Sequence, residues 1–150
     1  MFFLDGKSQS EKATSLVVDA KEVHENAKLK IQFQRTLRIP DDNQKYPLPP
    51  GLGAFPLEYV DDYPEKIPTS WEEHGGIFLP MFQAEALWLN FNNVHIDSGG
   101  YPFAIKIATG KINAVNGDTW CNELVDSDGE HSQDYVVVPG QMWLDGYSVD

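Results

Sequence analysis

The stretch Leu29-Lys30-Ile31-Gln32-Phe33-Gln34, which continues to Ile39, alternates apolar and polar side chains. Successive side chains of a strand point to opposite faces, so this alternation predicts a strand with one buried and one solvated face. Arg35 falls on the apolar side, where it requires either a carboxylate partner or a bulge that shifts the register. Pro40 and the polar residues after it end the strand.

Further runs downstream also have the composition of strands. Residues 84–91 are apolar on nearly both faces, as is typical of a central strand. Residues 103–108 alternate, residues 111–115 follow a Thr-Gly turn, and Asn116-Gly117 is a strong hairpin turn. Residues 135–138 form one more apolar run. These segments predict an antiparallel meander.

The fold class expected from these runs is α+β and mainly β, with a twisted antiparallel sheet that closes into a barrel or sandwich. The inward-facing residues of its strands should form one contiguous core. We expect that core to contain Phe33, Leu37, Leu87, Leu89, Phe103, Ile105, Val136 and Val138.

Residues 1–28 differ from the rest and are expected to form a separate N-terminal segment. Ser10 is a candidate helix cap, and Leu16, Ala20, Val23 and Ala27 recur at helical spacing. The neighbouring valines oppose a helix. The pattern favours one short amphipathic helix, with a partly ordered arm as the alternative, followed by a β-rich domain at residues 29–150.

Composition limits the class of partner. The chain has 150 residues, enough for one domain, and a net charge of -12 from 23 acidic and 11 basic residues. Such a surface repels phosphate groups, so we expect no nucleic acid and no membrane as partner. Open sheet edges and strands apolar on both faces favour a protein partner or a homo-oligomer. The single cysteine, Cys121, excludes an intrachain disulfide and favours the cytoplasm.

The best candidate metal site is an acidic segment with carboxylates at nearly every second position. Calcium is the candidate ion, because carboxylates with this spacing can converge on a hard cation. The segment lacks the glutamate that closes an EF-hand loop, so an exposed acidic turn is the simpler interpretation. The candidate ligands are Asp126, Asp128, Glu130 and Asp134.

His95 and Asp97 form the candidate catalytic pair. Their spacing of two would place both side chains on one side of a strand, where they could act as acid and base or as metal ligands. A histidine in a surface turn is the alternative. Two tryptophans with polar neighbours, Trp71 and Trp120, are candidates for an exposed platform that binds a sugar or a peptide.

Four short sequence motifs lie in the middle and at the end of the chain. They are Tyr46–Gly53 (YPLPPGLG), Gly110–Ala114 (GKINA), Gln133–Pro139 (QDYVVVP) and Trp143–Gly146 (WLDG). Through these motifs the chain resembles a group of uncharacterised proteins, from about residue 29 to residue 146. The resemblance implies no activity and no catalytic residue, and it implies that the chain corresponds to part of such proteins.

The function expected from the sequence is therefore that of a non-catalytic β-rich module with an acidic surface. It would bind a protein partner or assemble with itself. The alternative is a metal-assisted hydrolase or lyase that uses a His/Asp/Glu cluster, formed by the candidate pair and the acidic segment. Convergence of those side chains in space discriminates between the two classes.

Overall fold

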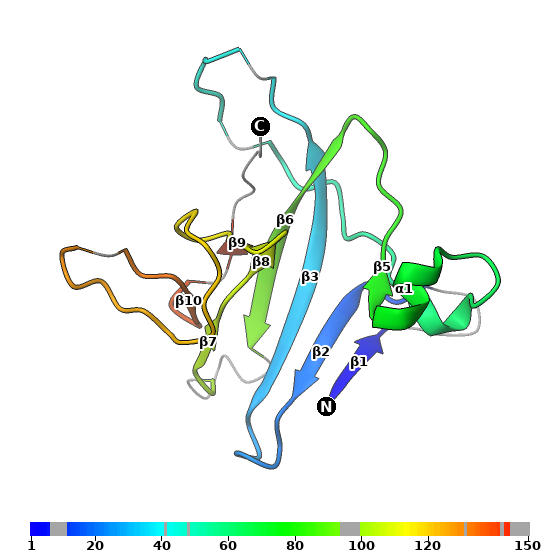
Figure 1. Cartoon of the computed structure of the whole chain (residues 1–150), viewed down its shortest axis with the longest axis horizontal. Helices are drawn as coiled ribbons and strands as arrows, with labels where there is room; N and C mark the ends of the chain where they lie inside the picture. Colours follow the sequence, from blue (N-terminus) through cyan, green and yellow to red (C-terminus); the bar gives the residue numbers. More distant parts are fainter. Residues whose placement is uncertain are drawn as a thin grey trace.

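A five-stranded antiparallel sheet lies at the centre of the fold (Figure 1). The computed structural model describes residues 1–6, 12–40, 42–47, 49–93, 100–130, 132–141 and 143–144. The strand order is β1-β2-β3-β6-β11. The bounds of these strands are Phe2–Asp5 for β1, Ser15–Asp19 for β2, Lys28–Leu37 for β3, Glu85–Asn93 for β6 and Trp143–Leu144 for β11.

The long ladder between β3 and β6 organises this sheet. It runs from the pair Leu29–Asn93 to the pair Leu37–Glu85. The strand predicted from the alternating stretch is confirmed. Of the carboxylate partner and the bulge expected for Arg35, the structure has the carboxylate partner. The Arg35 guanidinium forms an ion pair with Glu85 on the neighbouring strand.

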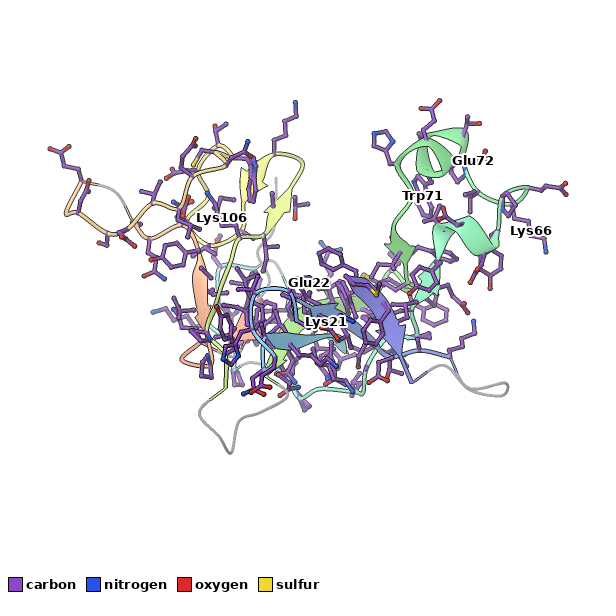
Figure 2. The ribbon with its side chains drawn as sticks, turned by 90° about the horizontal axis from the view of Figure 1, so that it is seen from below. Lys21, Glu22, Lys66, Trp71, Glu72 and Lys106 are labelled. Carbon is purple, nitrogen blue, oxygen red and sulfur yellow. The ribbon has the colours of Figure 1, made fainter. Side chains whose placement is uncertain are left out.

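Two lobes rise from one side of the sheet (Figure 2). The first lobe, residues 58–78, contains the strand pair β4 (Glu58–Tyr59) and β5 (Ile77–Phe78), the 3-10 helix η1 (Val60–Asp62) and the helix α1 (Thr69–His74). The second lobe, residues 103–138, contains the strand pair β7 (Phe103–Ile105) and β10 (Val136–Val138). It also contains the hairpin of β8 (Ala108–Thr109) and β9 (Ile112–Asn113).

The expected closed sheet is wrong. Over the described residues the structure is mainly β, with 36% strand and 7% helical residues, and none of the sheets they form closes into a barrel. The edge strands β1 and β11 of the large sheet are not paired with each other, and the remaining strands form three separate pairs. Strands of two or three residues, interrupted by turns, are too short to continue the ladder around a barrel.

The expected N-terminal helix is also wrong. The described part of this segment contains β1 and β2, and the helix of the structure lies at residues 69–74 instead. Val17 and Val18 are stiff at χ1 and favour a pleated strand. Tertiary pairing decides the outcome, because β2 forms hydrogen-bonded ladders with both β1 and β3.

The apolar core lies where the sheet meets the second lobe. Leu29, Phe91, Val136 and Val138 are buried there, and Leu89, Phe103 and Ile105 pack against them. Leu37 was expected in this core but is 55% exposed, because it lies at the last pair of the β3–β6 ladder. In the described part of the chain, no helix is both long enough and apolar enough to span a membrane.

Candidate functional site

The most buried charges of the described chain lie in the second lobe. The side chains of Lys106 and Asp134 form an ion pair, with only 7% and 4% of their surfaces exposed. Lys106 Nζ also donates to the carbonyl oxygens of Cys121, at 2.9 Å, and Glu123, at 2.6 Å. The backbone N–H of Val125 donates to Asp134 Oδ1 at 2.9 Å. Such partners offset the desolvation of both charges.

The two charged groups stabilise each other's ionised forms. Burial by itself would raise the pKa of Asp134, but the hydrogen bonds from Lys106 and Val125 bring this pKa below its ordinary value. Burial would lower the pKa of Lys106, but the hydrogen bond to Asp134 raises it above its ordinary value. Both groups are therefore charged at neutral pH, and neither is poised to exchange a proton.

Other side chains of the second lobe complete this cluster. Cys121 Sγ lies 3.4 Å from Lys106 Nζ and 3.6 Å from Asp134 Oδ2. Asn113 is buried, and its Nδ2 donates to the Asp134 carbonyl at 2.7 Å. The Trp120 ring lies 4.9 Å from Lys106 Nζ, which is a cation–π distance. The cluster ties the long loop after β9 to Lys106, which directly follows β7.

The remaining acidic candidates do not converge on one point. Asp126 accepts a hydrogen bond from the Tyr135 hydroxyl, and Asp128 accepts one from the backbone N–H of Glu130. Glu130 is exposed. Across the described residues, no group of three or more His, Cys, Asp or Glu side chains is placed to hold a metal ion. The candidate catalytic pair, His95 and Asp97, lies outside the described residues.

Trp71 lies on α1, beside a pocket of about 390 Å³ in the first lobe. Its side chain is 46% exposed, and its ring centroid lies 6.1 Å from that of Phe78 on β5. The other lining residues are Val60, Ser70, His74, Gly75 and Ile77. The predicted tryptophan therefore contributes to a concave, partly aromatic surface.

The two candidate tryptophans do not form one platform. Figure 2 shows Trp71 in the first lobe and Lys106, which contacts Trp120, in the second lobe on the opposite side of the molecule. Trp120 is half-buried, and its Nε1 donates to Asn122 Oδ1 at 3.1 Å. Of these two rings, Trp71 is the one that faces an open pocket.

A second apolar surface lies at the end of the β3–β6 ladder, and we call it the ladder-end patch. Leu37 and Phe82 are both neighbours of Glu85: Leu37 is its ladder partner, and the backbone N–H of Phe82 donates to Glu85 Oε2 at 3.3 Å. Ile39 lines an open pocket of about 470 Å³ next to them. The members of the patch and their exposed fractions are Leu37 (55%), Ile39 (40%), Met81 (43%) and Phe82 (72%).

Sequence reasoning did not find the buried pair of the second lobe or the partners of Trp71. Lys106 and Asp134 are 28 residues apart, and no periodic signal links them. Lys106 occupies a polar position of an alternating run, which gives no sign of burial. Phe78 follows the pair Gly75-Gly76 closely in the sequence. Two glycines indicate a turn, but they do not indicate a pocket.

Comparisons with known proteins identify no relative of this chain. No family model matches it, and neither the curated proteins nor the solved structures contain a match.

Proposed function

We propose that this chain is a non-catalytic β-rich module that binds protein, and that it associates with a second copy of itself through the ladder-end patch. The observation that carries the proposal is the exposure of four large apolar side chains in that patch. Contiguous exposed apolar side chains are typical of surfaces that bind protein. We place such a module in the cytoplasm, since its single thiol fits a reducing compartment.

The charge distribution supports a second copy as the occupant. Each copy carries a net charge of -12, so two copies repel over most of their surfaces. The segment 28–40 has four basic residues and no acidic residue. Three of its basic residues pair with carboxylates, while Arg38 lines the pocket beside the patch. Arg38 therefore offsets part of the repulsion between two copies at this patch.

The metal-assisted hydrolase or lyase receives no support from the described residues. Asp126, Asp128 and Asp134 each accept a hydrogen bond from another group of the chain. Their carboxylates accept hydrogen bonds from the same chain and thereby stabilise the loop after β9.

Sedimentation equilibrium of two variants tests whether the patch is the interface. The double variant Leu37→Ser/Phe82→Ser should remain at the monomer mass of 16.9 kDa under conditions where the wild type is heavier. The matched control is Phe2→Ser, which removes a phenylalanine that is 70% exposed on the edge strand β1. Dissociation by the control but not by the double variant would contradict the assignment and place the interface at β1.

A further inference from the structure

The pocket beside Trp71 has the size and lining of a small binding site. Its volume of about 390 Å³ lies at the lower end of the range of about 300–1,000 Å³ for ligand pockets. Two aromatic rings, Trp71 and Phe78, face it together with the aliphatic side chains of Val60 and Ile77. Tyr63 packs edge-on against Phe78, with ring centroids 5.5 Å apart, and holds that ring in place. The site therefore takes a group with an apolar body.

The surroundings of this pocket are strongly acidic. Asp61 Oδ1 lies 3.7 Å from the position that a Cβ atom would take at Gly75, a lining residue. Glu72 lies next to Trp71 on α1 (Figure 2). Between residues 58 and 74 there are six acidic residues, and the basic residues are Lys66 and His74. An anionic group would be repelled from this lobe, and a cationic group would be attracted.

Aromatic faces and carboxylates together favour one kind of ligand. The negative face of an indole or phenyl ring attracts an alkylammonium ion, and tryptophan does so best. We propose that this pocket binds the alkylammonium group of a lysine side chain, methylated or not, on a protein partner. The methylene groups would contact Val60 and Ile77 while the ammonium group faces Trp71. This inference rests on the proposed function, since it takes the cation to belong to a protein.

Binding of small probes measures the chemistry of the pocket directly. We choose choline and its uncharged isostere 3,3-dimethylbutan-1-ol, which have nearly the same shape and differ in charge. The readout is the indole N–H signal of Trp71 in a nitrogen–proton spectrum, assigned with Trp71→Phe. Choline should shift this signal in a saturable way, and the isostere should bind about two- to five-fold more weakly. Equal binding of both probes, or no response of Trp71, would overturn the proposal.

Matched variants separate the roles of ring and charge. Trp71→Leu should abolish the binding of choline, measured by isothermal titration calorimetry because the variant lacks the Trp71 signal. The other three indole signals report that the fold persists. Asp61→Asn should weaken binding, whereas Glu130→Gln, the same change of charge in the second lobe, should leave it unchanged. An equal effect of both charge variants would overturn the role of Asp61.

Peptide probes test the source of the cation. Acetyl-Gly-Lys-Gly-amide and its trimethyllysine form should shift the same indole signal. Binding of choline without binding of either peptide would overturn the assignment to a protein side chain. The Leu37→Ser/Phe82→Ser variant keeps the pocket and should bind choline like the wild type. A wild type that binds choline but stays monomeric would contradict the proposed self-association and leave the pocket assignment intact.

Discussion

Lys106 and Asp134 show how a buried pair of charges can organise a long loop between short strands. The ammonium group contacts the Asp134 carboxylate and two carbonyl oxygens, so every strong partner comes from residues 121–134. Removal of one member of such a pair leaves an uncompensated buried charge, which destabilises more than removal of both. The pair is therefore a structural unit of the second lobe.

Variants at this pair should show strong coupling. We expect Lys106→Met alone to lower the free energy of unfolding more than the double variant Lys106→Met/Asp134→Leu does, because the single variant leaves a buried carboxylate without its cation. Urea unfolding at pH 7 measures both. Additive losses would show that the two side chains do not depend on each other.

The same pair should contribute to the pH dependence of stability. The pKa of Asp134 is lowered in the folded state, so its contribution is present above its unfolded pKa of about 3.9 and is lost as pH falls through the lower folded value. The pKa of Lys106 is raised, so its contribution is present below about 10.4 and is lost as pH rises through the higher folded value. Asp134→Asn should flatten the acid limb, and an unchanged limb would contradict this account.

Phe91 tests the core at the residue scale. Its side chain is 1% exposed and lies in the cluster between the sheet and the second lobe. Phe91→Ala should cost about 3–5 kcal/mol, because the lost contacts leave a cavity. The matched control is Phe2→Ala on the edge strand, where the side chain is 70% exposed and the change should stay within about 0.5 kcal/mol. Similar losses in denaturant unfolding would contradict the assigned core.

At the scale of elements, the sequence predicted the strands of the long ladder but not how the sheet ends. The alternation around Ile31 and Phe33 was sufficient, because one face of β3 is apolar along most of its length. The segment now called β2 was predicted as a helix, since alanines and leucine at helical spacing outweighed two valines. Pairing with β1 and β3 reverses that preference, and single-sequence periodicity contains no information about pairing.

The acidic segment shows the same limit for the candidate site. Its carboxylates recur at the spacing expected of a calcium loop. However, Tyr135 donates a hydrogen bond to Asp126, and Lys106 donates one to Asp134. Sequence spacing reports which side chains are close along the chain, and it does not report which other groups reach them. The exposed ring of Trp71 was predictable because its flanking residues are polar.

Calcium should therefore leave the stability of the protein unchanged. A ligand that binds the native state raises the melting temperature by mass action. Because the carboxylates of this segment are engaged by the chain, millimolar calcium should produce no shift in a thermal unfolding experiment. A clear rise that disappears in Asp128→Asn would contradict this arrangement and restore the metal site.

At the scale of the whole molecule, two apolar surfaces of different character remain open. The ladder-end patch lies beside Arg38 and suits a second copy of an acidic chain. The Trp71 pocket is small, acidic at its rim and suits a cationic side chain.

Static light scattering of the wild type across a dilution series tests the proposed association most directly. We expect a weight-average mass above 16.9 kDa at high concentration, which falls toward 16.9 kDa on dilution. Added salt should favour the associated form, because it screens the repulsion between two copies that each carry a net charge of -12. A mass of 16.9 kDa at every concentration and at both low and high salt would contradict the account.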